Sequence, residues 1–259
     1  MTDDPTAAKA TKQFMLTPAA SKRLIAKAMV HHPAVQGVLK KGTLVIVAGT
    51  TNGYVAEEIL ASINQLDSFT RKGFVRGAVY GPGFKPTGKF GGDVVIVDGV
   101  WQKDAPKTIF DVVDGLKSCD LILKGANALD MLTGRAGVLI GDPKCGTAGA
   151  AIPAVVGRRV QMIIPVGLEK RVSGNLNQIA SLVNDQNTEG PRLLLLPGQV
   201  FTELDAIAQL TGASAQLVAA GGVCGAEGIV WLAVQGNAQQ LEAAKILIQS
   251  VATEPPCQP

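Results

Sequence analysis

Aromatic residues are scarce in this chain of 259 residues, making up 4% of it. So few aromatic rings leave little on which nucleic-acid bases could stack, and the net charge of +3 comes without a basic stripe. We therefore expect no nucleic-acid partner. Hydrophobic residues, by contrast, make up 47% of the sequence, and 30 residues are glycine. This length and composition predict an α/β protein that buries a sizeable core.

Cysteine and histidine are also few. The four cysteines lie far apart, and the two histidines, His31 and His32, are adjacent. None has the spacing of zinc ligands, so we predict no metal site, and no motif indicates a cofactor. Unpaired cysteines favour a reduced compartment. Because the N-terminal stretch lacks an apolar centre and no apolar run is long enough to cross a bilayer, we expect a cytoplasmic protein without a membrane partner.

Short apolar runs alternate with segments of helical periodicity along most of the chain. Residues 19–42 have helical spacing interrupted at Pro33, which predicts two short helices with His31 and His32 at the break. The alternation that follows predicts an α/β fold with a doubly wound, largely parallel, Rossmann-like sheet. The runs expected to be strands include TLVIV, FVRGAVY, DVVIVDGVW, DLILKG, AGVLIGDP and VQMIIPVG, and residues 108–118 are expected to be helical.

The chain divides into four expected parts. Residues 1–18 are predicted to be a mobile N-terminal segment, and residues 19–190 the α/β core. Residues 191–252 are predicted to form a smaller C-terminal α+β lobe, in which Thr202 is a good N-cap for a helix. Residues 253–259 are expected to be a disordered tail.

The stretch AGTTNG, residues 48–53, joins an expected strand to an expected helix. Glycine lets the chain turn with its amides inward, and a helix start adds unpaired N–H groups and the positive end of the helix dipole. In a parallel sheet such a turn lies at the carboxyl edge, where ligands bind. We therefore predict that a phosphate or carboxylate is bound here. The residues concerned are Gly49, Thr50, Thr51, Asn52 and Gly53. The alternative is a plain turn whose threonine and asparagine side chains cap the helix.

Two further turns have a similar composition and are expected at the same edge. CDLILKGANALD ends a strand with Gly125 and Asn127, and DPKCGTAGAAIPAVVG brings Gly146 and Thr147 to a helix start. In their order, the three motifs resemble the superfamily of ribose-phosphate isomerases, glucosamine-phosphate deaminases, CoA transferases and initiation-factor-2B proteins. IVAGTTNGYVAEEIL is similar to the opening phosphate loop of that superfamily, and DLILKGANALD to its Asp-x-x-x-x-Gly-Ala-Asp-x-x-Asp stretch. KCGTAGAAIPAVVGRRVQMIIPVG is similar to the Asn-Lys-x-Gly-Thr turn and following elements of the initiation-factor and sugar-phosphate isomerase branch. The resemblance covers about residues 20 to 170.

The resemblance implies a small phosphorylated ligand, a sugar phosphate or a nucleotide, and an aldose–ketose isomerisation if the protein is an enzyme. Asp130 or Asp98 would then move the proton, and Lys124 or Lys144 would steady the developing oxyanion. The isomerases carry an aspartate where this chain has Asn127, and an amide does not exchange protons as a carboxylate does. The resemblance therefore implies a divergent member. Because members of the superfamily are dimers or larger, it also implies a homo-oligomer.

Other functions are compatible with the sequence. Asn127 favours a ligand-sensing or assembly protein that has kept the pocket and lost catalysis. Glu227, within GGVCGAEGIVW, resembles the nucleophilic glutamate of CoA transferases, which would indicate an acyl-CoA transferase or hydrolase; a glycine-rich hairpin turn is the alternative. Cys145 at a helix start is a candidate nucleophile or a buried small side chain. For Lys124 and Asp130 the alternative is an ordinary ion pair at a strand end.

Overall fold

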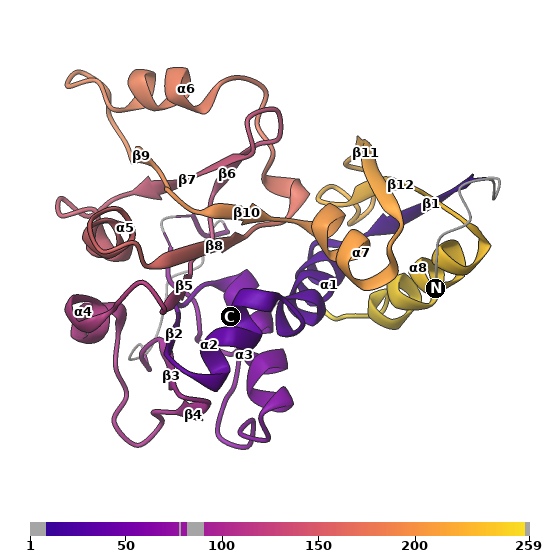
Figure 1. The fold of residues 1–259 in the computed structure, drawn as a ribbon. Coiled ribbons are helices and arrows are strands. Elements are labelled where there is room, and N and C mark those ends of the chain that lie inside the picture. Colours follow the sequence, from indigo (N-terminus) through magenta and orange to yellow (C-terminus); the bar gives the residue numbers. More distant parts are fainter. Residues whose placement is uncertain (1–8, 78, 82–90, 257–259) are drawn as a thin grey trace.

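The computed structural model describes residues 9–77, 79–81 and 91–256, which form a larger and a smaller lobe (Figure 1). Eight α-helices occur in these residues: α1 (Pro18–Val30), α2 (Pro33–Lys40), α3 (Thr50–Ser62), α4 (Ile109–Val112), α5 (Gly146–Ile152), α6 (Leu176–Val183), α7 (Glu203–Thr211) and α8 (Ala238–Val251). The strands are β1 (Ala10–Leu16), β2 (Thr43–Ile46), β3 (Val94–Val97), β4 (Val100–Trp101), β5 (Leu121–Leu123), β6 (Ala128–Asp130), β7 (Arg135–Ile140), β8 (Gln161–Pro165), β9 (Arg192–Leu195), β10 (Gln199–Phe201), β11 (Ser214–Ala220) and β12 (Val230–Gly236). Within these described residues, every helix is too short or too polar to span a bilayer.

The larger lobe is built on a six-stranded sheet with the order β10-β8-β5-β2-β3-β4. The first four strands are parallel, and β3 and β4 continue the sheet in antiparallel pairs. Almost every residue of β2, β5 and β8 is buried, as expected for strands covered on both faces. Figure 1 shows α4 and α5 on one side of this sheet and α1, α2 and α3 on the other. The expected mixed α/β fold with a mostly parallel sheet is confirmed.

Local capping signals place several helices where the sequence predicts them. Thr17 caps α1 by accepting a hydrogen bond from the Ala20 N–H at 3.2 Å. His32 caps α2, its Nδ1 accepting from the Ala34 N–H at 3.2 Å, so the predicted break between two helices is confirmed. Thr202 caps α7 in a capping box, also as predicted.

The larger lobe also contains a separate three-stranded antiparallel sheet, β6-β7-β9. The sequence pattern predicted the run AGVLIGDP, which contains β7, as a member of the parallel sheet, and this is wrong. Only residues 131–134 connect β6 to β7, whereas a parallel neighbour requires a crossover of about a dozen residues or more. The short connection therefore forces a hairpin. The amphipathic helix α6 packs on this sheet.

Other local expectations need correction. The run FVRGAVY was expected to be a strand, but its described residues, 74–77, 79 and 80, form none. The neighbouring strand β3 is already paired on both sides, by β2 and β4. The expected helix at 108–118 is shorter: α4 is followed by one turn of 3-10 helix, Val113–Gly115. The glycine- and proline-rich stretch GPGFKPTGKF, whose composition is typical of a loop, lies outside the described residues except for Gly81.

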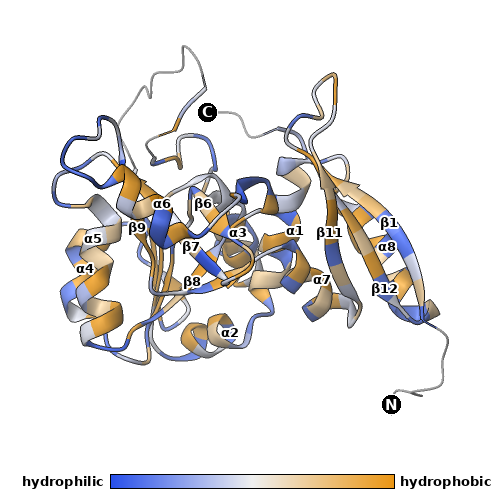
Figure 2. Ribbon diagram, turned by 90° about the horizontal axis from the view of Figure 1, so that it is seen from above, coloured by the Kyte–Doolittle hydropathy of each residue, from blue (hydrophilic) through white to orange (hydrophobic). Residues whose placement is uncertain are grey.

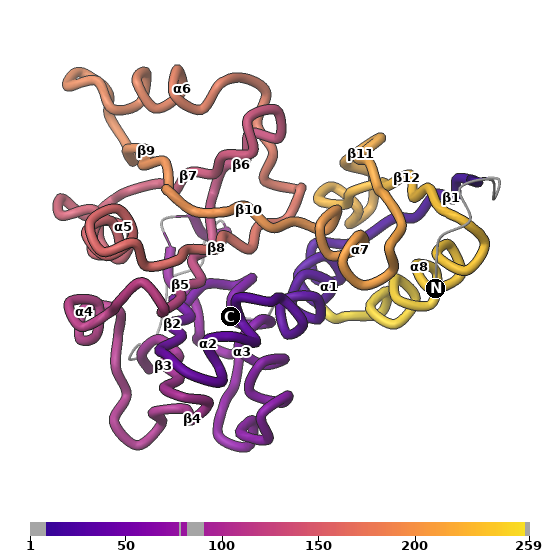
Figure 3. The backbone as a smooth tube through the Cα atoms, viewed as in Figure 1, coloured from indigo at the N-terminus to yellow at the C-terminus, as the bar shows by residue number. Residues whose placement is uncertain are grey.

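The smaller lobe combines the two ends of the chain. Its antiparallel sheet has the order β1-β12-β11, so residues 10–16 form a strand and are not a mobile segment. Figure 3 shows this N-terminal strand beside the C-terminal elements. The predicted boundary at residue 191 is also displaced, because β9 and β10 belong to sheets of the larger lobe. The pairing of β1 with β12 joins residues far apart in the chain, so the local sequence pattern does not indicate it.

The two lobes share one hydrophobic core. Figure 2 shows α1 and α7 between the large sheet and the strands β1, β11 and β12. Helix α1 packs on α3 in the larger lobe and on α8 in the smaller one, and its residues Leu24 and Ile25 are fully buried. Most buried apolar residues of both lobes therefore form one continuous cluster, apart from a small cluster beneath α6, and the lobes are coupled through α1.

Candidate functional site

A cavity of about 970 Å3 opens at the carboxyl ends of β2 and β5. Its wall contains residues 48–52 after β2, residues 124–127 after β5, and much of the segment 138–148 from β7 into α5. The three turns singled out in the sequence thus meet at one cavity. The third turn, however, follows β7, a strand of the antiparallel sheet. Residues 75–77 and 79–81 close another side.

The start of α3 supplies backbone donors to the cavity. Gly49 is the N-cap and makes no side-chain cap, so the first N–H groups of the helix have no intrahelical partner. Thr50 and Thr51 belong to this turn and line the cavity. Thr51 is 2% exposed, and its Oγ1 has no hydrogen-bond partner among the described residues. A buried hydroxyl without a partner beside a cavity indicates a place for a ligand atom.

Asn52 has a different role from the phosphate donor that the sequence predicted. Its Nδ2 donates to the carbonyl of Val47 at 2.8 Å and to the carbonyl of Leu123 at 2.9 Å. The side chain therefore ties the end of β2 to the end of β5, and both amide hydrogens are used. Its buried Oδ1, which has no partner among the described residues, is left only as an acceptor.

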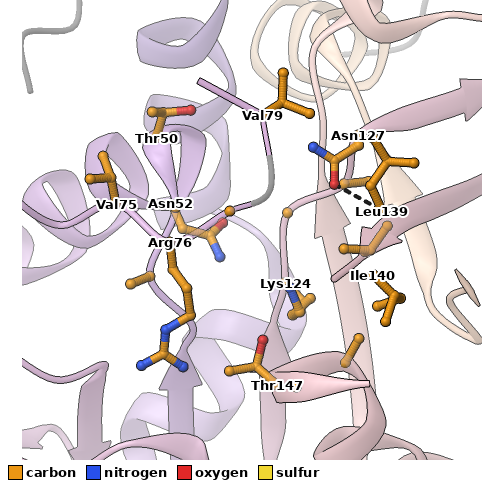
Figure 4. A pocket seen from close by; sticks show the side chains of 18 of the residues that line it. Thr50, Asn52, Val75, Arg76, Val79, Lys124, Asn127, Leu139, Ile140 and Thr147 are labelled. Atoms are coloured by element: carbon orange, nitrogen blue, oxygen red, sulfur yellow. Dashed lines mark hydrogen bonds between the residues drawn. The ribbon is translucent and has the colours of Figure 1, made fainter. Parts of the chain in front are cut away.

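Asn127 contributes a donor. Its Oδ1 accepts a hydrogen bond from the Leu139 N–H at 3.0 Å, and its own N–H donates to the Gly137 carbonyl at 2.8 Å. Figure 4 shows the amide nitrogen pointing away from Leu139. Because the oxygen is fixed by the backbone, the side chain presents an N–H group to the cavity. Gly125, two residues earlier, also lines it.

Three basic side chains line the cavity: Lys124, Lys170 and Arg76. Lys124 is only 8% exposed, and burial lowers its pKa to about 8; Asp93 opposes this shift, and the charges of Arg76 and Lys170 add to it. Burial also lowers the pKa of Lys170, whose Nζ donates to the Ala126 carbonyl at 2.8 Å. One buried and two partly buried cations in the same wall favour a negatively charged occupant.

Asp93 holds one side of the site together. Its carboxylate accepts from the Ala48 N–H at 2.9 Å and from the Ile109 N–H at 2.7 Å, and it lies 3.8 Å from the Arg76 guanidinium. It therefore fixes the end of β2, the start of α4 and the orientation of Arg76. Sequence reasoning missed Asp93 and Arg76, because neither lies in a strand-end turn.

Lys170 was also missed, although a signal was present. It ends the 3-10 turn Leu168–Lys170, which follows β8, so a third parallel strand delivers a residue to the same edge. Behind it, the fully buried Glu203 accepts from the Leu168 N–H at 3.2 and 3.0 Å. Burial and the negative charge of Glu169 raise the pKa of Glu203 to about 7. This carboxyl group anchors the turn that carries Lys170.

Both predicted catalytic aspartates lie outside the cavity wall. Asp98 accepts from the Gly42 N–H at 2.8 Å and therefore lies near the start of β2. The reason is that β3 runs antiparallel to β2, which carries its last residue to the opposite edge. Asp130 accepts from the Thr133 Oγ1 at 2.8 Å and from the Leu132 N–H at 2.9 Å, closing the β6–β7 hairpin. The Thr133 hydrogen bond lowers the pKa of Asp130 and keeps it ionised.

Of the other residues predicted from the sequence, some line the cavity and some do not. Gly146 and Thr147 line the cavity, and so does Cys145, whose backbone has a φ of 62°. Lys144 is exposed and does not line the cavity. Gly53 is the fourth residue of α3 and is likewise not part of the wall. Glu227 is exposed in the turn between β11 and β12 of the smaller lobe.

The described part of the cavity wall is basic and holds few carboxylates. Asp142 is the only carboxylate among the described residues of its wall, and it is exposed. Within the same described part of the chain, no three His, Cys, Asp or Glu side chains gather as metal ligands would. Comparison of the chain with known protein families, curated proteins and solved structures found no match.

Proposed function

We propose that this protein binds a small phosphorylated metabolite in the cavity at the carboxyl ends of β2 and β5. The observation that carries the proposal is the buried ammonium group of Lys124, with Lys170 and Arg76 in the same wall. The unpaired N–H groups at the start of α3 add donors suited to phosphate oxygens. We further propose that the chain is a divergent, doubly wound member of the superfamily that its three turns resemble.

The energetics of Lys124 favour an anionic ligand. A buried ammonium group without a close counter-ion is unfavourable, which the lowered pKa of Lys124 expresses. A bound phosphate would supply that counter-ion, so part of the cost of burying the charge returns as binding energy. The charge of Asp93 raises the pKa of Lys124 but does not outweigh the effect of burial, so Asp93 balances only part of the ammonium charge.

Binding is better supported than turnover. The proton-transfer step assigned to Asp98 or Asp130 has no support, since both carboxylates serve hairpin or strand-start contacts away from the cavity. Acyl transfer through Glu227 is equally unsupported, because that residue lies in a turn of the other lobe. We therefore favour a ligand-sensing or assembly protein over an isomerase. That the protein is cytoplasmic and that it forms a homo-oligomer both remain predictions.

Replacement of Lys124 tests the proposal. Lys124→Met keeps most of the side-chain volume and removes the charge, so the fold is expected to persist. Titration calorimetry with ribose 5-phosphate and inorganic phosphate should show a loss of affinity of about tenfold or more, the worth of a charge-assisted hydrogen bond. Lys144→Met is the matched control, because Lys144 is exposed and outside the wall. Equal effects of the two variants, or no binding of any phosphate compound at millimolar concentration, would overturn the proposal.

A further inference from the structure

The cavity has a cationic end and an apolar end. Figure 4 shows Arg76, Lys124 and Thr147 toward one end, and Val79 and Leu139 toward the other. Tyr80 and Val138, the chain neighbours of Val79 and Leu139, also line the cavity. A volume of about 970 Å3 is near the upper limit for pockets that hold drug-sized ligands, so phosphate alone would leave most of it empty.

Several apolar side chains at this cavity are exposed to water. Val79 is 63% exposed, Phe110 is 54% exposed and Tyr80 is 37% exposed, and all three line the cavity. Val79 and Tyr80 belong to the segment before β3, whereas Phe110 lies in α4, whose first residue donates its N–H to Asp93. Exposed apolar side chains in the wall of a pocket indicate contact with an apolar group of a ligand.

Asn127 lies beside this apolar end and adds a directional donor. Figure 4 places it next to Leu139, whose N–H holds its Oδ1 at 3.0 Å. The amide group cannot flip without losing that hydrogen bond, so Nδ2 remains the group offered to a ligand. A ligand that fills the apolar end therefore gains by carrying a hydrogen-bond acceptor.

We infer that the ligand is a phosphate monoester with a planar, largely apolar body that carries acceptor atoms, as in a nucleoside 5′-monophosphate. The phosphate would lie at Lys124, Lys170 and Arg76, and the ring system between Val79 and Leu139. This inference rests on the proposed function and goes beyond it, because a sugar phosphate satisfies the cationic end alone.

The test compares ligands that share a phosphate and differ in the body. Titration calorimetry would be done with ribose 5-phosphate, with adenosine, guanosine and uridine 5′-monophosphates, and with adenosine. At least one nucleotide is expected to bind about tenfold or more tightly than ribose 5-phosphate, and adenosine more weakly than its monophosphate. Val79→Ser should reduce the affinity for the nucleotide about threefold or more and reduce the affinity for ribose 5-phosphate less.

The controls separate this inference from the proposed function. Val156→Ser is the matched variant, because Val156 is 64% exposed and does not line the cavity. Equal affinities for ribose 5-phosphate and all three nucleotides, or equal effects of Val79→Ser and Val156→Ser, would overturn the inference and leave phosphate binding standing. Phosphate compounds that bind equally well to the Lys124→Met variant would instead overturn the proposed function.

Discussion

The ionisable side chains of the cavity carry its chemistry, and Lys124 among them has a pKa of about 8 because it is buried. A bound anion stabilises the charged form of this group, so affinity should fall as pH rises through about 8. A phosphate monoester gains its second negative charge near pH 6, so affinity should rise through that value. Calorimetric titration from pH 5.5 to 9.5 should show a maximum between the two. In the Lys124→Met variant the alkaline fall should disappear; a fall of the same size there would contradict the assignment.

Glu203 makes the stability of the protein depend on pH. Its pKa is about 7 in the folded chain and 4.5 ordinarily, so between these values the folded state holds a proton that the unfolded state has released. Stability should therefore fall as pH rises through this window and level off above pH 7. Glu203→Gln keeps an oxygen for the Leu168 N–H and removes the charge. It should stabilise the protein at pH 8 by on the order of 1–3 kcal/mol.

Urea unfolding at pH 5 and pH 8 measures this effect. The expected result is a smaller difference between the two pH values for Glu203→Gln than for the parent protein. Glu189→Gln, at an exposed position, should leave the difference unchanged. The same pH difference in both variants would show that Glu203 does not titrate in this range.

At the scale of elements, the turn that leads into α5 packs so closely against Gly149 that a side chain would not fit there. A Cβ at Gly149 would lie 2.5 Å from the Lys144 carbonyl oxygen and 2.7 Å from the Cys145 Cβ. Because both neighbours belong to the turn at the cavity wall, Gly149→Ala should displace that turn. We expect a loss of stability of about 1–3 kcal/mol, together with weaker binding of phosphate compounds.

Gly37→Ala is the matched control for this variant. Gly37 lies within α2 and has no atom within 4 Å of an added Cβ. The substitution should therefore stabilise the protein by up to about 1 kcal/mol, since alanine is the better helix former. The midpoint of thermal unfolding should fall for Gly149→Ala and rise for Gly37→Ala, relative to the parent protein. Equal shifts in the two variants would show that the turn tolerates a side chain at Gly149.

At the scale of the whole molecule, Glu254 near the end of the described chain forms ion pairs with residues that are distant in sequence. The Glu254 carboxylate accepts from Arg23 of α1 at 2.9 Å and from Arg71 at 3.2 Å. Arg71 also stacks on the Tyr54 ring of α3, with 3.9 Å between the guanidinium carbon and the ring centroid. Residues 253–256 therefore do not belong to the disordered tail that the sequence predicted, and residues 257–259 lie outside the described part.

Loss of this contact should destabilise the protein. Burial alone would raise the pKa of Glu254, but the hydrogen bond from Arg23 and the charges of Arg23 and Arg71 outweigh it, so the pKa is lowered. Glu254→Gln should cost about 1–2 kcal/mol at pH 7, and less as pH falls below 4.5 and the parent carboxylate takes up its proton. Glu242→Gln, at a side chain that is 53% exposed, should have little effect. Denaturant unfolding at pH 7 and pH 4 compares them.

The sequence by itself determined features that depend on a few neighbouring residues. The caps at Thr17, His32 and Thr202 follow from side chains that bond to N–H groups two or three positions away. Short buried strands and the glycine-rich turns after β2 and β5 follow from local hydrophobicity and backbone freedom. Because parallel strands end at one edge, these turns were expected to meet, and the structure brings them to one cavity.

Only the tertiary structure decided which charged groups reach that cavity. Asp98 lies at the opposite edge because β3 is antiparallel, and Asp130 closes a hairpin. Lys170 and Arg76 reach the wall through the turn after β8 and the segment before β3. The direction and pairing of strands depend on contacts between residues far apart in the chain, which local sequence patterns do not encode. For the same reason β1 could be recognised only in its pairing with β12.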